Sequence, residues 1–271
     1  MKKYKLLALD MDGTILDSKK NFPKEVASSI RALVDQGIHV ALATGRGLAE
    51  LKDYEKEISC LSYGILVSGG IVYDFKQEKP VFRQALTLEQ SLEILEAGEK
   101  EHAMLHILSS DKSICRSQDI QDMETYHMGI YQGMYERSCD TMDDLRGYVT
   151  EHPEEAIKIN SYHRSPEARE RMMENLAHLP VMPVLAETTS LEISPKGISK
   201  AKGLEVLCEY LGISTEEVVA VGDARNDMEI LSLAGMPVAM GNAMEEVKEI
   251  CRDVVRDNDH FGVIDAMQRY F

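Results

Sequence analysis

The chain has 271 residues, enough for one large domain or two modest ones, each with its own hydrophobic core. Its content of 44% hydrophobic and 28% charged residues is ordinary for a soluble globular protein. Lys and Arg number 30 against 46 Asp and Glu, and the resulting net charge of −16 counts against binding to nucleic acid or to an anionic membrane. A ligand that carries phosphate would need a local cation on such a surface.

The cysteines and the start of the chain indicate the compartment. The five cysteines are scattered and form no CxxC pair, which suits a reducing cytosol and argues against a disulfide framework or a cysteine zinc site. The apolar run after Met1–Lys5 stops at Asp10, too early for a signal peptide, and no stretch approaches the roughly 20 apolar residues of a membrane span. We expect a soluble, cytoplasmic protein.

Short apolar runs alternate with helical patterns at both ends of the chain. In the N-terminal part, residues 6–9 and 38–43 read as buried strands around a helix that starts at Pro23 and stops at Gly37. Near the C-terminus the order is a helix at 200–211, a strand at 218–221, a helix from about Asn226 and a strand at 236–240. This alternation predicts an α/β fold with a doubly wound, Rossmann-like parallel sheet.

The middle of the chain has a different organisation. Helices are predicted at 88–100 and 166–179, and strands at 104–108, 156–162 and 181–185. None of these strands ends in the acidic residues that follow the strands elsewhere. We therefore expect an inserted, smaller α/β cap domain at residues 84–187, within a core domain made of residues 1–83 and 188–271.

Polar side chains follow three predicted strands of the core. Asp10 and Asp12 come directly after the first strand, Thr44 and Gly45 after the second, and Asp223 and Asp227 after a strand near the C-terminus. The carboxyl ends of parallel strands share one sheet edge, where ligands bind. Carboxylates about 4 Å apart repel by roughly 4 kcal/mol at an effective dielectric of 20, so such a group needs a hard divalent cation. Oxygen-only ligands favour Mg²⁺.

These residue types support phosphoryl transfer. A carboxylate such as Asp10 can attack phosphorus as a nucleophile, and Asp12, two residues further on, is within reach for general acid and base work. Thr44 offers a hydroxyl, and Gly45 permits close backbone approach to phosphate oxygens. Lys200 lies near the start of a predicted helix, where an anion site is physically reasonable.

Five motifs in order resemble the haloacid dehalogenase-like hydrolase superfamily, and within it the Cof-type phosphatases with a type IIB cap. The motifs are DMDGT (10–14), ATGR (43–46), LEISPKGISKAKGL (191–204), GDARND (222–227) and MPVAMGNA (236–243). The resemblance covers about residues 3–82 and 188–271, together with the topology of the insert. It implies a Mg²⁺-dependent phosphatase that acts on a small phosphorylated metabolite through an aspartyl-phosphate.

The resemblance also implies a role for each matching residue. Asp10 would be the nucleophile and a metal ligand, and Asp12 the general acid and base, with its backbone carbonyl on the metal. Asp223 would be the third protein ligand, supported from nearby by Asp227. The residues implied to hold phosphate are Thr44, Gly45, Lys200, Asn226 and the backbone amide of Met11.

Several questions stay open at this stage. Arg46, Lys196 and Ser68 either contact substrate or serve the local structure, and Asn242 is interpreted as a cap of the following helix. The eight histidines show no ligand spacing, and the pair His102 and His106 lies on a predicted strand, where a spacing of four is uninformative. A phosphomutase on the same scaffold and a non-catalytic phospho-acceptor are the alternative functions. The sequence does not indicate the natural substrate or the oligomeric state.

Overall fold

The computed structural model describes residues 4–186 and 188–271. The first three residues, considered above for a signal peptide, and Glu187, at the predicted domain boundary, lie outside the described residues. Contacts divide the chain into two compact units. The first unit runs up to Gly45, then from Tyr54 to Phe82 and from Ser199 to Phe271, and the second comprises Arg46–Asp53 and Arg83–Ile198.

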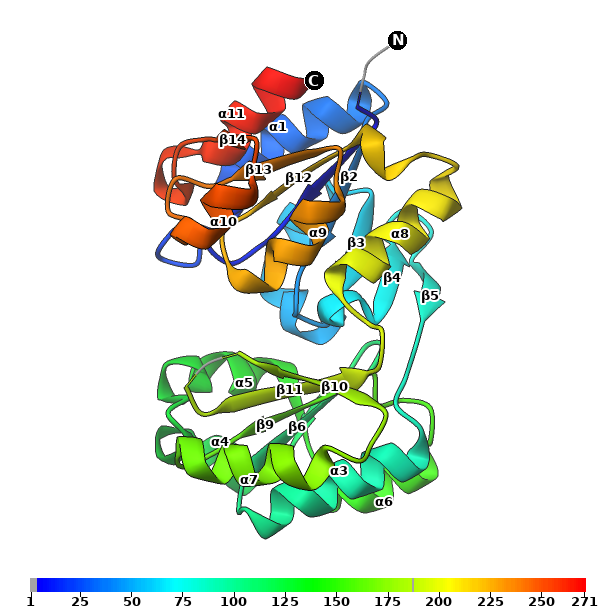
Figure 1. The fold of residues 1–271 in the computed structure, drawn as a ribbon, viewed down its shortest axis with the longest axis vertical. Coiled ribbons are helices and arrows are strands. Elements are labelled where there is room, and N and C mark those ends of the chain that lie inside the picture. Colours follow the sequence, from blue (N-terminus) through cyan, green and yellow to red (C-terminus); the bar gives the residue numbers. More distant parts are fainter. Residues whose placement is uncertain (1–3, 187) are drawn as a thin grey trace. The chain divides into compact units, whose positions relative to one another are not determined.

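The described residues of the first unit build an eight-stranded sheet (Figure 1). Its strands, in spatial order, are β14 (Asp253–Val254), β13 (Met236–Ala239), β12 (Val218–Gly222), β1 (Leu6–Leu9), β2 (His39–Ala43), β3 (Tyr63–Leu66), β4 (Ile71–Asp74) and β5 (Lys79–Arg83). All pairs from β14 to β3 are parallel, and β3 pairs with β4 in the antiparallel sense. Strand β1 therefore lies inside the sheet, hydrogen-bonded to β2 on one side and to β12 on the other.

Helices cover both faces of this sheet. They are α1 (Lys24–Asp35), α2 (Glu55–Ile58), α8 (Lys200–Leu211), α9 (Met228–Leu233), α10 (Glu245–Ile250) and α11 (Gly262–Tyr270). Helix α1 packs against α11, whereas α9 packs against α8 and α10, and the two groups lie on opposite faces in Figure 1. The predicted doubly wound α/β core is confirmed.

The sequence explains why these elements form. All four residues of β1 are buried, as an apolar run between two parallel neighbours requires. Helix α1 buries Val26, Ile30 and Leu33, which recur at helical spacing. It begins one residue later than expected, because Pro23 adopts an extended conformation and serves as the residue before the first turn.

The second unit has a six-stranded sheet of its own. Its strands, in spatial order, are β10 (Val181–Leu185), β11 (Ser190–Pro195), β9 (Lys158–Tyr162), β6 (Met104–Leu108), β7 (Ser113–Cys115) and β8 (Cys139–Thr141). All neighbours are antiparallel except β7 and β8. The helices are α3 (Leu88–Lys100), α4 (Ser117–Gln121), α5 (Gln132–Ser138), α6 (Leu145–Glu151) and α7 (Pro166–Leu176). Helix α3 packs against both α6 and α7, and a second apolar cluster includes Tyr135 of α5 and Ile120 of α4.

The extent of the second unit differs from the predicted 84–187. Strand β11 pairs with β10 and β9, from Val181 opposite Pro195 to Leu185 opposite Leu191, so a boundary at 187 would cut a hairpin. The sequence predicts that the core resumes at residue 188, because the core motif that contains Lys200 begins at Leu191, inside this strand. The unit also takes in Arg46–Asp53, a segment that begins with the last residue of the ATGR motif.

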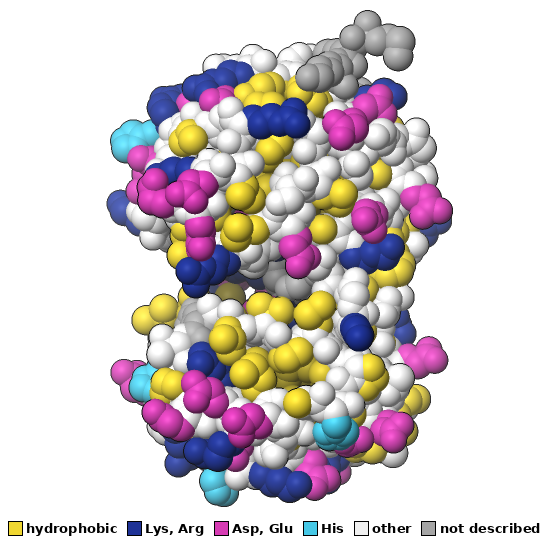
Figure 2. Space-filling view, in the orientation of Figure 1, with side chains coloured by type: hydrophobic (Ala, Val, Ile, Leu, Met, Phe, Trp, Pro, Cys, Tyr) yellow, Lys and Arg dark blue, Asp and Glu magenta, His cyan; other side chains and the backbone are white. Residues whose placement is uncertain are grey.

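The surface charge and the helix lengths can be compared with the expectation that the chain binds neither nucleic acid nor a membrane. On the face drawn in Figure 2, Asp and Glu side chains are spread among Lys and Arg and do not gather into one patch. Within residues 4–186 and 188–271, every helix is too short or too polar to cross a bilayer.

Candidate active site

Strand β1 delivers Asp10 to the carboxyl edge of the first unit's sheet. The backbone amide of Asp10 donates to the carbonyl of Val221 at 3.0 Å, which continues the pairing of β1 with β12 by one residue. The residue Asp10 is 7% exposed. An aspartate that is buried this deeply needs partners for its carboxylate.

The loop after β1 approaches the end of β12 closely. Gly13 has φ of 85°, and a Cβ atom at this position would lie 2.4 Å from Oδ2 of Asp223. The hydroxyl of Thr14 donates to Oδ1 of the same aspartate at 3.3 Å. Glycine is therefore required here both by the left-handed backbone and by the close approach of the carboxylate.

A tight loop after β12 holds Asp227. Its Oδ2 accepts the backbone amides of Asp223 at 3.1 Å and Ala224 at 3.2 Å, and the residue is fully buried. Gly222 leaves room for this arrangement, because a Cβ atom there would lie 2.7 Å from Oδ2 of Asp227. The loop thereby fixes Asp227 against the sheet edge.

Lys200 connects the two carboxylates. It is the first residue of α8, whose preceding residue Ser199 accepts the amide of Lys202 with its hydroxyl. The Nζ atom of Lys200 lies 2.7 Å from Oδ1 of Asp10 and 2.7 Å from Oδ1 of Asp227. Burial favours the neutral amine, but attraction from Asp10 and then from Asp227 outweighs it and raises the pKa of Lys200, so the side chain is a cation.

The carboxylates of Asp10, Asp223 and Asp227 have oxygens within 4.8 Å of one another. Burial, followed by repulsion from Asp227, raises the pKa of Asp10 well above its ordinary value, although Lys200 opposes the shift. The same two causes raise the pKa of Asp223 to about 6. One lysine does not compensate this group, and its oxygen-only donors fit Mg²⁺. Asp227 already uses both oxygens in hydrogen bonds, which suits a supporting role.

Asp12 has different surroundings. Its carboxylate is partly exposed and lies 2.7 Å from Nζ of Lys20, and the close carboxylate group is formed without it. The sequence analysis did not predict this role of Lys20, because its spacing of eight residues from Asp12 is not typical of any motif. The pair holds the Asp12 side chain at the solvent side of the loop.

The residues predicted to hold phosphate come to the same edge. Thr44 follows β2 and is 2% exposed, with its amide donating to Ile65 and its carbonyl accepting from Ser68. Asn226 lies exposed in the loop after β12. The side chain of Met11 is buried, and its carbonyl accepts the amides of Thr14, Ile15 and Leu16. These bonds anchor the loop that carries Asp12.

Asn242 does not cap the following helix, contrary to the interpretation from its sequence position. Helix α10 starts after Met244 without a side-chain cap. Instead, Asn242 donates to the carbonyl of Gly13 at 2.8 Å and accepts the amide of Asn258 at 3.1 Å. It therefore ties the Asp12 loop to a distant loop of the same unit, a role that only the tertiary structure defines.

Three other residues left open by the sequence have these positions. Arg46 belongs to the second unit, where its guanidinium donates to Sδ of Met134 at 3.7 Å. Lys196 is exposed in the turn after β11, as a solvated lysine would be. Ser68 has φ of 56°, in the left-handed region that favours glycine.

Together, this fold and site define a hydrolase-type α/β core: a parallel sheet whose carboxyl edge gathers acidic residues and a buried lysine, with a second α/β unit inserted in the chain. The chain belongs to the haloacid dehalogenase-like hydrolase family, whose pattern matches residues 7–267. The resemblance to the Cof-type phosphatases with a type IIB insert is thereby confirmed, and the chain is an enzyme of the phosphatase group.

Similar proteins support this placement. A haloacid dehalogenase-like hydrolase from Bacteroides thetaiotaomicron superposes with a TM-score of 0.86 at 26% identity, over 99% of this chain and 100% of that one. The 5-amino-6-(5-phospho-D-ribitylamino)uracil phosphatase YcsE of Bacillus subtilis is 26% identical, over 98% of this chain and 95% of its own length. The chloroplastic endoribonuclease YBEY of Arabidopsis thaliana is 28% identical over 99% of this chain, which spans only 47% of that protein.

Proposed function

We propose that the chain is a Mg²⁺-dependent phosphatase that hydrolyses a small phosphorylated metabolite through an aspartyl-phosphate on Asp10. One observation carries the proposal: the buried carboxylate of Asp10, at the end of an inner parallel strand, is paired with the ammonium of Lys200 and has the carboxylates of Asp223 and Asp227 close by. Lys200 partly balances the charge of Asp10 at the carboxyl edge of the sheet, which is where ligands bind in parallel sheets.

The residues that would hold the metal follow from the donor set. Asp10, Asp223 and the backbone carbonyl of Asp12 would bind Mg²⁺, with Asp227 supporting them. When bound, the ion supplies positive charge that offsets the negative charge of the phosphate oxygens. Lys200 adds a second, permanent cation beside Asp10.

The chemistry itself is assigned to two carboxylates. An oxygen of Asp10 attacks phosphorus, the bond from phosphorus to the leaving oxygen breaks, and Asp12, which enters this step in its protonated form, donates its proton to that oxygen. In the second step Asp12 removes a proton from water, whose oxygen attacks phosphorus. The bond from phosphorus to Asp10 then breaks, which releases inorganic phosphate and restores the carboxylate. To take part in these steps, the Asp12 side chain has to release Lys20 and form a hydrogen bond to the leaving group instead.

The core residues and the relatives give different information about the substrate. The proposed core residues recognise a phosphate group and do not distinguish what is attached to it, so we assign selection of the leaving group to the second unit. The relative named for 5-amino-6-(5-phospho-D-ribitylamino)uracil supports a phosphomonoester of a sugar or polyol. A phosphorylated metabolite of this kind is the proposed substrate.

The test is a phosphate-release assay over a panel of sugar and polyol phosphates with Mg²⁺. Release should stop with chelator and return with Mg²⁺, while Ca²⁺ should inhibit because it prefers more and looser ligands. Full activity in excess chelator would refute the metal assignment. An isomerised sugar phosphate without free phosphate would indicate a phosphomutase instead.

A further inference from the structure

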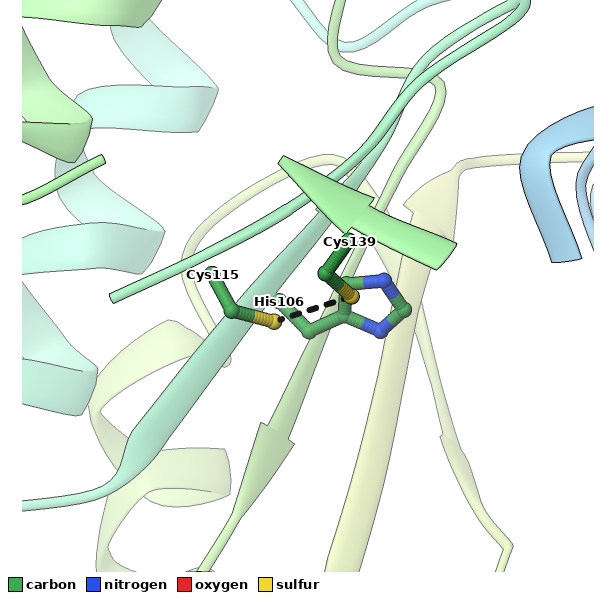
Figure 3. A group of neighbouring side chains, drawn as sticks. All are labelled: His106, Cys115 and Cys139. Carbon is green, nitrogen blue, oxygen red and sulfur yellow. Dashed lines mark hydrogen bonds between the residues drawn. The ribbon is translucent and has the colours of Figure 1, made fainter. Parts of the chain in front are cut away.

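The second unit contains a group of side chains that could bind a metal ion, formed by residues that have no role in the proposed reaction. One ring nitrogen of His106 and the sulfurs of Cys115 and Cys139 are all within 4.8 Å of one another. Figure 3 shows the three side chains converging, with the sulfur of Cys139 over the imidazole and the sulfur of Cys115 beside it. His106 and Cys115 are buried, and Cys139 is partly exposed.

The register of three neighbouring strands brings these side chains together. His106 of β6 is paired with Cys115 of β7, and Cys139 of β8 is paired with Ser113, two residues before Cys115. Paired residues and residues two apart point to the same face of a sheet. All three ligand candidates therefore project from one face, although 9 and 24 residues separate Cys115 from the other two in the sequence.

Hydrogen bonds orient the imidazole. Nδ1 of His106 lies 3.1 Å from the hydroxyl of Tyr135, which is itself 2.6 Å from the hydroxyl of Tyr162. Nε2 lies 2.6 Å from the hydroxyl of Ser113, and this oxygen is 2.9 Å from the sulfur of Cys139. With its proton on Nδ1, donated to Tyr135, the ring accepts the Ser113 hydroxyl at Nε2, and this hydroxyl has to turn away for Nε2 to bind a metal. A partner on the second nitrogen is typical of a histidine that binds metal.

The sulfur geometry favours a shared metal over a direct bond between the sulfurs. The sulfurs of Cys115 and Cys139 are 3.8 Å apart, and two thiolates about 2.3 Å from a tetrahedral Zn²⁺ are separated by about 3.8 Å. An offset of two residues between adjacent strands places the Cα atoms about 8 Å apart, because residues rise about 3.3 Å and strands lie about 4.8 Å apart. Disulfides need Cα atoms within about 7 Å, so the strands would have to shift.

We propose that His106, Cys115 and Cys139 bind one Zn²⁺ ion through Nε2 and the two sulfurs, with water as the fourth ligand. Two thiolates and an imidazole form a known donor set for Zn²⁺ with an open position. Access is provided at Cys139, which is partly exposed on the edge strand β8.

The ion would link three strands of the sheet at its edge. Strand β8 has only three residues and a single neighbour, β7, among the described strands. A ligand from each of β6, β7 and β8 would tie this short edge strand to the sheet interior. Metal binding to the folded state would therefore raise the melting temperature of the protein.

Co²⁺ titration of the reduced, metal-free full chain tests the proposal, because Co²⁺ substitutes for Zn²⁺ and gives a charge-transfer band only when thiolate binds it. Excess Mg²⁺ is present to occupy the aspartate group. We expect a thiolate band that saturates at one Co²⁺ per chain and disappears when Zn²⁺ is added. Cys115→Ser, Cys139→Ser and His106→Ala should weaken or abolish it.

Matched controls are available in the first unit. Cys60→Ser and Cys208→Ser change buried cysteines outside the group, and both should keep the band. The proposal is wrong if the folded wild-type chain gives no thiolate band, or if the band survives in Cys115→Ser and Cys139→Ser. It is equally wrong if mild peroxide joins these two cysteines in the folded chain while Co²⁺ still fails to bind.

Discussion

The two groups of possible metal ligands, one in each unit, are positioned by different parts of their sheets. The group of Asp10, Asp223 and Asp227 in the first unit lies at the edge of a parallel sheet: Asp10 and Asp223 directly follow β1 and β12, and Asp227 lies in the loop after β12. The His106 group of the second unit lies on the face of a mainly antiparallel sheet, and its members sit within or at the start of strands. An edge site thus leaves contiguous motifs in the sequence, whereas a face site depends on strand register alone.

The largest loss of activity should come from substitution of Asp10, the proposed nucleophile at the edge of the parallel sheet. Asp10→Asn should lower kcat by about 10⁴-fold or more and remove the hydroxylamine-sensitive phosphoenzyme, because an amide is a poor nucleophile. Asp17→Asn is the matched control, since the carboxylate of Asp17 accepts the backbone amides of Lys19 and Asn21 within its own loop. A phosphoenzyme that persists in Asp10→Asn would move the nucleophile to another residue.

Asp12→Asn should have the next largest effect. Loss of a general acid and base typically lowers the rate by about 10²–10⁴-fold. The backbone carbonyl is kept, so Mg²⁺ and phosphate analogues should still bind with affinities near those of the wild type. Activity measured beside calorimetric binding separates the two effects, and wild-type turnover would contradict the assignment of Asp12.

A pair of glycine substitutions separates backbone strain from crowding at the site. Gly13 and Gly37 have φ of 85° and 82°, but only Gly13 has a carboxylate where its Cβ would go. Gly13→Ala should lower kcat/KM by about 10- to 100-fold, because the loop or Asp223 must move. Gly37→Ala should cost only about 1–2 kcal/mol of unfolding free energy. Equal activity of the two variants would show that the close approach is unimportant.

The smallest effect is expected for Asn242→Ala. The substitution removes the hydrogen bonds to Gly13 and Asn258, worth about 1 kcal/mol each, and should lower kcat by less than about tenfold. Thermal unfolding monitors the stability, and the same variant assayed for phosphate release monitors the loop. A loss as large as that of Asp12→Asn would give Asn242 a direct role toward the ligand.

Much of the first unit could be predicted because its signals are local. The predicted helix at 200–211 agrees with α8, and the strands at 6–9 and 218–221 agree with β1 and β12 to within a residue. Each is an apolar run or stripe bounded by polar residues, and the parallel arrangement follows from their alternation. The convergence of Asp10 with Asp223 followed once the two strands were assumed to be neighbours.

Apart from the local pair of Asp12 with Lys20, the main failures of prediction concern pairing between distant segments. Residues 190–195 form a strand whose pattern fits either sheet, and only its pairing with β9 and β10 assigns it to the second unit. The three metal-ligand candidates of the His106 group were treated as unrelated because no short spacing connects them. Asn242 was interpreted from its own neighbours in sequence, although its partners are Gly13 and Asn258.

The order of segments along the chain has a consequence for synthesis on the ribosome. Strand β1 emerges early, but its neighbour β12 and the helix that carries Lys200 follow the whole of residues 83–198. The inserted unit therefore has all its strands available before the surrounding unit does, and domains generally fold as units during translation. We expect the inserted unit to fold first. Asp10 can pair with Lys200 only after the C-terminal part of the surrounding unit has left the exit tunnel.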